Sequence, residues 1–78
     1  MTSIEIKMNR LVEEVLTEMN PEAKIFSVTE DPLAGGVVRI IIQWPAIESF
    51  VIKICLPLEN HIIKKEMERQ ILTKLEGH

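Results

Sequence analysis

Hydrophobic positions in the first quarter of the chain follow a helical period. Between residue 3 and residue 19 they recur at intervals of three and four residues, which places them on one face of an α-helix. The set comprises Ile4, Met8, Leu11, Val12, Val15, Leu16 and Met19. Thr2 and Glu5 have the spacing of a capping box, and Pro21 ends the pattern because the residue before a proline avoids the helical conformation. We therefore predict an amphipathic helix over 3–19.

The middle of the chain has the alternating pattern of β-strands, over residues 24–30, 37–44 and 49–56. In the first strand, Phe26 and Val28 are expected to share one face. In the other two strands one face is entirely apolar, with Val38, Ile40, Ile42 and Trp44 on the second and Phe50, Ile52, Ile54 and Leu56 on the third. The opposite faces are mixed, which is typical of an antiparallel sheet that is covered on one side only. The loop at 31–36 contains the pair Gly35–Gly36, which predicts a turn with a positive φ angle.

A second helix is predicted over 59–76, after Pro57. Asn60 is the expected N-cap and Gly77 the expected C′ residue, one position beyond the C-cap. The apolar stripe consists of Ile63, Met67, Ile71, Leu72 and Leu75. Ile62 projects away from this stripe.

The predicted order of elements is α-β-β-β-α. The simplest packing is a two-layer α+β fold, in which a three-stranded antiparallel meander carries both helices on its apolar face. A chain of 78 residues is too short for a second core, so residues 1–78 are expected to form one small domain.

The composition adds an excess of apolar residues to this picture. Hydrophobic residues make up 46% of the chain, whereas a domain of this size buries only about 60% of the surface of its unfolded chain. This fraction excludes intrinsic disorder, and the single cysteine excludes a disulfide-stapled scaffold. No signal-peptide pattern is apparent, and the longest apolar run, 40–42, is far short of the ~20 residues of a membrane span. We therefore expect a cytoplasmic protein that does not enter the membrane.

The excess apolar residues are expected on the outer face of the sheet, opposite the helices. Four of them, Val37, Ile41, Val51 and Cys55, are expected to be contiguous there, with Ile25 beside them if the first strand keeps its phase. The predicted polar border consists of Arg39, Gln43, Ser49 and Lys53, and Ile62 adds an exposed aliphatic residue on the second helix. An apolar centre within a polar rim is typical of a binding surface.

We predict from this surface a non-enzymatic interaction or regulatory protein that self-associates through its sheet, with a dimer favoured. A small accessory or scaffold protein of a larger complex is an alternative. The sequence leaves open whether association uses the sheet face, a sheet edge or the second helix.

The candidates for catalysis or metal binding are few. Cys55 lies two residues from Lys53 on the same face. A neighbouring ammonium group can favour a reactive thiolate, but we interpret Cys55 as a small, semi-apolar surface residue. Cys55, Glu59 and His61 lack the paired spacing of a zinc site. We therefore expect no catalytic residues, no metal and no cofactor.

The order of elements resembles that of double-stranded RNA-binding domains. The resemblance extends to Lys64 and Lys65 near the start of the second helix, with Arg69 following, where that family has a lysine cluster. It implies nucleic-acid contacts by these three residues. The chain departs from the family in having Met67 and Ile71 at inward positions where alanines are expected. The net charge of −3 also provides no general basic excess, so nucleic-acid binding is a second alternative.

The segment 12–21 is similar to the first helix of small iron–sulfur scaffold domains of the NifU type. The function of those domains depends on a C-x-x-C pair of ligands. Because this chain has only Cys55, cluster binding does not follow from the similarity.

Overall fold

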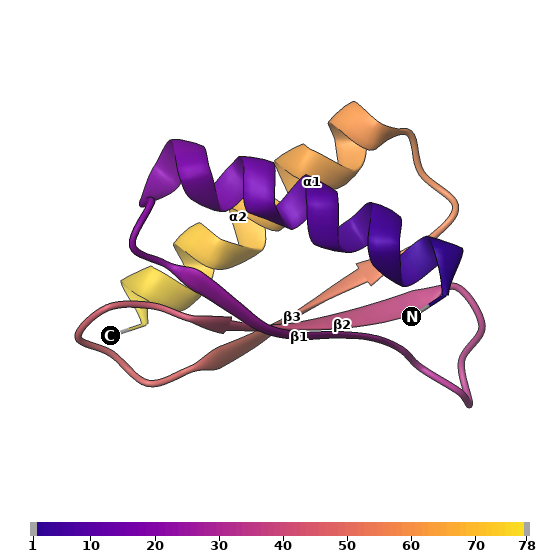
Figure 1. Ribbon diagram of the computed structural model, residues 1–78, viewed down its shortest axis with the longest axis horizontal. Coiled ribbons are helices and arrows are strands. Elements are labelled where there is room, and N and C mark those ends of the chain that lie inside the picture. Colours follow the sequence, from indigo (N-terminus) through magenta and orange to yellow (C-terminus); the bar gives the residue numbers. More distant parts are fainter. Residues whose placement is uncertain (1, 78) are drawn as a thin grey trace.

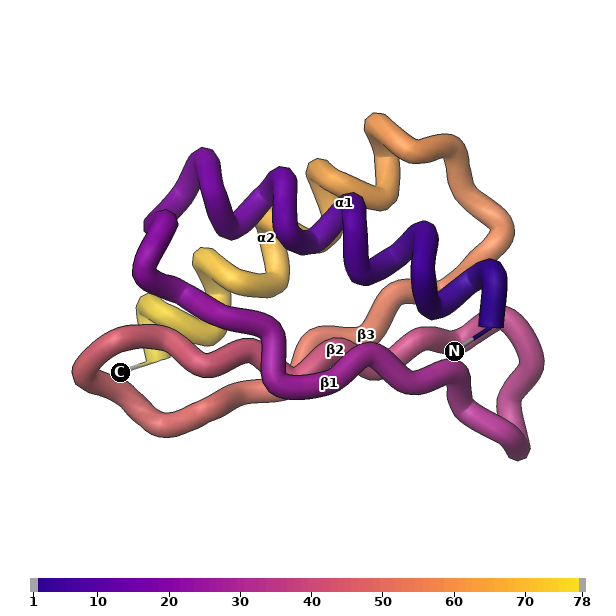
Figure 2. Tube along the Cα trace, in the orientation of Figure 1, coloured from indigo at the N-terminus to yellow at the C-terminus, as the bar shows by residue number. Residues whose placement is uncertain are grey.

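Both helices lie on one face of a three-stranded antiparallel sheet, as Figure 1 shows. The computed structural model describes residues 2–77. The elements are α1 (Ser3–Met19), β1 (Lys24–Glu30), β2 (Val37–Gln43), β3 (Phe50–Cys55) and α2 (Asn60–Glu76). The strand order is β1-β2-β3, with β2 in the centre, and the two connecting turns lie at opposite ends of the sheet (Figure 2). The predicted α+β fold and α-β-β-β-α order are confirmed.

Helix α1 begins with the predicted capping box. The Glu5 amide donates to the Thr2 hydroxyl at 3.1 Å, and the Thr2 amide donates to Glu5 Oε1 at 2.9 Å. The second oxygen of the same carboxylate, Oε2, accepts a hydrogen bond from the Glu30 amide at 2.9 Å. The Thr2 amide first, and then the Glu30 amide, lower the pKa of Glu5. One side chain therefore caps α1 and fastens its first turn to the end of β1.

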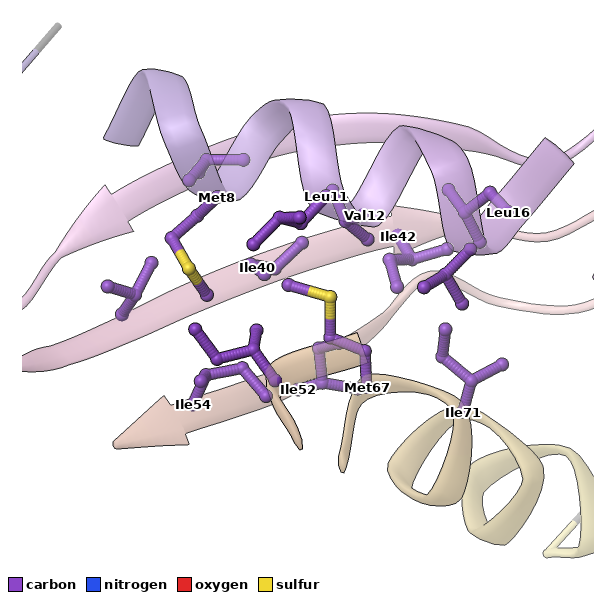
Figure 3. Close-up of a cluster of buried hydrophobic side chains, with 14 of the residues drawn as sticks. Met8, Leu11, Val12, Leu16, Ile40, Ile42, Ile52, Ile54, Met67 and Ile71 are labelled. Carbon is purple, nitrogen blue, oxygen red and sulfur yellow. The ribbon is translucent and has the colours of Figure 1, made fainter. Parts of the chain in front are cut away.

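The core lies between the sheet and the helices, and Figure 3 shows its side chains pointing toward one another from both layers. The strands contribute Val28, Val38, Ile40, Ile42, Phe50, Ile52 and Ile54, all buried. The helices contribute Met8, Leu11, Val12, Val15, Leu16, Ile63, Met67 and Ile71. Helix α1 packs on β1, α2 packs on β3, and the two helices contact each other. The predicted alternation is confirmed within β2 and β3, since every second residue of each strand is buried. Trp44, Ser49 and Leu56, predicted at the strand ends, lie just outside the strands, and Trp44 and Leu56 are partly buried against the core.

Strand β1 departs from the predicted alternation because it contains a β-bulge. Ile25 pairs with Ile42 and Ser27 with Ile41, so Phe26 is an extra residue without a partner across the strand pair. Phe26 is 65% exposed, whereas Ile25 packs against the core. The prediction that Phe26 shares the face of Val28 was therefore wrong. The strand does not keep its phase, which was the condition for Ile25 to lie on the outer face, and Ile25 lies on the core side. One inserted residue moves the side chains on one side of the bulge to the opposite face of the sheet from the one that strict alternation predicts.

Helix α2 differs from its prediction at its ends and at one position of its stripe. Glu59, not Asn60, is the N-cap, and it makes no side-chain capping bond. Gly77 is the C-cap residue and has a right-handed helical conformation. Leu72, predicted in the stripe, is 44% exposed, because Ile71 occupies the buried position next to it. The exposure of Ile62 is confirmed, at 41%.

Gly36 is the loop residue that needs a positive φ angle, at +81°. Its carbonyl oxygen accepts a hydrogen bond from the Leu56 amide at 2.6 Å, which joins the β1–β2 loop to the end of β3. A Cβ atom at Gly36 would lie 3.1 Å from the Leu56 carbonyl oxygen, whereas one at Gly35 would meet nothing within 4 Å. The two adjacent glycines are thus a matched pair for substitution.

We expect Gly36→Ala to lower the free energy of unfolding by about 1–2 kcal/mol, because an L-residue is strained in the left-handed region. Gly35→Ala is expected to change it by less than about 0.5 kcal/mol. Urea denaturation followed by circular dichroism measures both. Equal stabilities of the two variants would contradict the assigned geometry of the loop.

Candidate interaction surface

The face of the sheet opposite the helices is open to solvent. We define this outer face by the outward residues of the three strands: Lys24, Ser27, Thr29, Val37, Arg39, Ile41, Gln43, Val51, Lys53 and Cys55. Both helices lie on the other side of the sheet (Figure 1). Val51 is 40% exposed and Ile41 is half-buried among its neighbours. The strands therefore present to solvent most of the residues that the sequence predicts at an interface, and Ile62 lies apart from them on α2.

The strand register divides the apolar residues of the outer face into two groups. Val37 pairs with Cys55, and Ile41 pairs with Val51. Between these two apolar pairs lies a third pair, Arg39 and Lys53, which are directly opposite each other. The sequence predicted that the four apolar residues are contiguous, and this was wrong. The side chains of Arg39 and Lys53 lie between the two apolar pairs. We call Arg39 and Lys53 the basic pair.

A hollow of about 520 Å³ lies on the outer face. Its lining residues come from all three strands: Ser27, Thr29, Arg39, Ile41, Val51 and Lys53. Volumes in this range are typical of ligand sites, although this hollow is open rather than enclosed. The lining combines two aliphatic side chains, two hydroxyl groups and the basic pair. Such a surface can hold an aliphatic group and an anionic group at the same time.

Asp31 positions one member of the basic pair. Its Oδ2 atom lies 3.0 Å from Arg39 Nη2, and its Oδ1 atom accepts hydrogen bonds from the Leu33 and Ala34 amides. The Leu33 amide, and then the Arg39 charge, lower the pKa of Asp31. Among residues 2–77, Lys53 makes no ion pair. The basic pair therefore keeps a net positive charge.

The outer edge of β3 is blocked at its centre by a side chain from α2. The Gln70 amide group accepts from the Lys53 N–H at 2.9 Å and donates to the Lys53 carbonyl at 2.6 Å. It thereby takes the place of the backbone of a fourth strand at this residue. Unpaired edge groups are the usual template for strand addition, and Gln70 removes two of them.

The edge of β1 is also modified. The bulge at Phe26 interrupts its regular hydrogen-bonding pattern, and Glu5 binds the Glu30 amide near its end. Bulges and side chains that occupy edge groups both discourage pairing between sheets. Neither edge is therefore a regular strand template, whereas the outer face is covered by neither helix (Figure 1).

The predicted nucleic-acid residues on α2 are largely paired with carboxylates. Lys64 Nζ lies 3.6 Å from Glu14 Oε2, and Arg69 binds Glu66 through two hydrogen bonds. The bonds from Arg69 and then Gln70 lower the pKa of Glu66 to about 2, so Glu66 is ionised over the physiological range. Lys65 is exposed, and within residues 2–77 it forms no ion pair. This arrangement leaves little unpaired positive charge for a phosphate backbone.

The other candidate groups do not converge on one site. Cys55 is exposed on the outer face. His61 is also exposed, and its Nδ1 atom lies 3.4 Å from Glu59 Oε2. Over the range 2–77, no three His, Cys, Asp or Glu side chains are grouped closely enough to hold a metal ion. Neither α1 nor α2 has the length and apolarity that crossing a membrane requires.

Sequence reasoning did not identify Gln70, Asp31 or the bulge at Phe26 as part of this region. Gln70 lies next to Ile71, at the border of the apolar stripe. That position of a polar amide is the one feature of the sequence that could have indicated its role. Asp31 begins a turn-forming segment, which predicts its hydrogen bonds to the loop but not its contact with Arg39.

We expect Gln70→Ala to destabilise the fold by about 1 kcal/mol, the usual net contribution of such hydrogen bonds. Hydrogen exchange at the Lys53 amide is expected to become faster, because that group loses its acceptor. NMR-detected exchange measures this directly. Gln43→Ala, which removes an exposed amide from β2, is the control and is expected to change neither quantity. Unaltered exchange at Lys53 in Gln70→Ala would contradict the role of Gln70 at the edge.

Comparisons of the chain with protein-family models, with curated proteins and with solved structures found no match. The interpretation of the outer face therefore depends on the geometry of this chain alone. That geometry has three parts: one uncovered sheet face, two modified edges and a basic pair between apolar neighbours.

Proposed function

We propose that this protein is a non-enzymatic protein-interaction module that binds a partner through the outer face of its sheet. The observation that carries the proposal is the open hollow at the centre of that face, where Ile41 and Val51 remain accessible beside polar groups. Exposed aliphatic residues within a polar surround are typical of interaction surfaces.

The chemistry of the hollow favours binding over catalysis. Its lining contains the hydroxyls of Ser27 and Thr29 but no histidine or carboxylate that could act as their base. A histidine or carboxylate is the usual base that activates a hydroxyl nucleophile. The lining groups are instead suited to hydrogen bonding, charge pairing and apolar contact.

The structure of the edges favours the face as the mode of association. Gln70 occupies the centre of the β3 edge, and the bulge at Phe26 disturbs the β1 edge. A partner that stacks on the face needs neither edge. A second copy, as the sequence predicts, and another protein of a larger complex are the two kinds of partner to distinguish.

The proposal predicts that substitutions on the outer face abolish partner capture. Affinity-tagged chain is incubated with lysate of its source cells supplemented with untagged chain, and captured proteins are quantified by mass spectrometry. The variant Ile41→Glu/Val51→Glu is expected to lose at least about tenfold of the specific capture, because it buries unpaired carboxylates at the interface. Recovery of the untagged chain identifies a second copy as the partner.

The matched control is Ile6→Glu/Leu72→Glu. It replaces two exposed aliphatic residues on the helices and adds the same two negative charges as the outer-face variant. It is expected to capture the same proteins as the unmodified chain. Circular dichroism confirms that all variants fold. Undiminished capture by the outer-face variant would overturn the proposal.

A further inference from the structure

The charge on the outer face is opposite in sign to that of the whole chain. The chain has 12 acidic and 9 basic residues, a net charge of −3. The hollow nevertheless contains two cations and no carboxylate among its lining residues. Positive charge is therefore concentrated on an otherwise acidic protein, at the place where apolar side chains are also accessible. A local positive charge of this kind favours partners that carry negative charge.

The three pairs across β2 and β3 form an ordered pattern along the strands. Val37–Cys55 comes first, the basic pair Arg39–Lys53 second, and Ile41–Val51 third. Neighbouring pairs on one face of a sheet are about 7 Å apart, which is two residues of an extended chain. The outer face thus presents apolar, cationic and apolar positions in succession.

This pattern disfavours a symmetric pair of identical faces. In a two-fold dimer centred on the outer face, the basic pair at the centre contacts the basic pair of the second copy. Two Arg39 and two Lys53 side chains then approach one another, and Asp31 offsets the charge of Arg39 only, so each copy brings a net positive charge to the centre. Like charges at an interface oppose association.

We propose that the outer face binds an extended acidic segment of a partner protein, with one carboxylate on the basic pair and an aliphatic side chain on either side. The inference rests on the proposed function, because it names the chemistry of the occupant of the same face. In the segment, the acidic residue lies two positions from each aliphatic residue, so all three point toward the sheet. The hydroxyls of Ser27 and Thr29 add polar contacts at the β1 side of the hollow.

A protein segment fits this face better than single-stranded nucleic acid does. Surfaces that bind single strands combine a positively charged groove with aromatic side chains on which bases stack. The lining of the hollow has no aromatic residue, and its apolar members, Ile41 and Val51, are aliphatic. The hollow thus offers two cations, Arg39 and Lys53, to a polymer with one charge per nucleotide.

The test is a selection of random dodecapeptides displayed on phage, with the immobilised full chain as target. Enriched sequences are expected to contain Asp or Glu two residues from an aliphatic residue on each side. Synthetic fluorescein-labelled copies of the enriched peptides are then titrated by fluorescence anisotropy. Arg39→Glu/Lys53→Glu is expected to weaken their binding by at least about tenfold, because it reverses the charge that meets the carboxylate.

The control variant is Lys7→Glu/Lys65→Glu, which makes the same change in net charge at exposed positions of α1 and α2. It is expected to bind the peptides as the unmodified chain does. Thermal unfolding of both variants shows whether each is folded at the assay temperature. A fluorescein-labelled oligo(dT) of twenty nucleotides is titrated in parallel.

Four results would overturn this inference: no enrichment, enriched peptides without the acidic residue, peptide binding that resists charge reversal, or oligo(dT) binding that requires the basic pair. Peptide binding that Ile41→Glu/Val51→Glu abolishes and Arg39→Glu/Lys53→Glu leaves intact would reject the acidic partner and retain the outer face. Peptide binding that neither pair of substitutions alters would reject both the inference and the proposed function.

Discussion

The burial of one face of a three-stranded sheet is the constraint on which this structure depends. Strands β2 and β3 place a large aliphatic or aromatic side chain at every second position, and these side chains form the floor of the core. Because α1 and α2 both pack on these side chains, the helices cover one face of the sheet only (Figure 1). The same alternation necessarily sends Arg39, Ile41, Val51 and Lys53 to the opposite face. The core and the open surface are thus two consequences of one pattern.

A sheet of three strands also has two edges, and both helices modify them. Glu5 from α1 binds the Glu30 amide of β1, and Gln70 from α2 binds both backbone groups of Lys53 in β3. Each side chain joins a helix to the strand on which that helix packs. The two contacts therefore serve the docking of the layers and also remove hydrogen-bonding groups that a second sheet could use. The outer face, in contrast, is covered by neither helix (Figure 1).

The parts of the fold that follow from local periodicity could be predicted from the sequence. The capping box at Thr2, the stripe of α1 and the alternation of β2 and β3 each involve residues a few positions apart. The parts that depend on distant residues could not. The bulge at Phe26 arises from how β1 pairs with β2, and no spacing within 24–30 reveals it.

The composition of the candidate site shows the same division. The outward direction of Arg39 and Lys53 follows from alternation, but their position opposite each other requires the register between β2 and β3. That register changed the interpretation of the surface, because it places charge between the apolar pairs. Gln70 was overlooked because its role depends on the docking of α2 against the edge of β3. The exposure of Leu72 likewise depends on the rotation of α2 about its axis.

The central claim is that one face of the sheet is buried and the other is open. Methyl NMR of isoleucine side chains in dilute solution, with and without a soluble paramagnetic agent, tests it most directly. The structure predicts strong relaxation enhancement for the Ile41 methyl group and little for Ile40, Ile42, Ile52 and Ile54, which are at most 1% exposed. Equal protection of Ile41 and its neighbours Ile40 and Ile42 would contradict the claim.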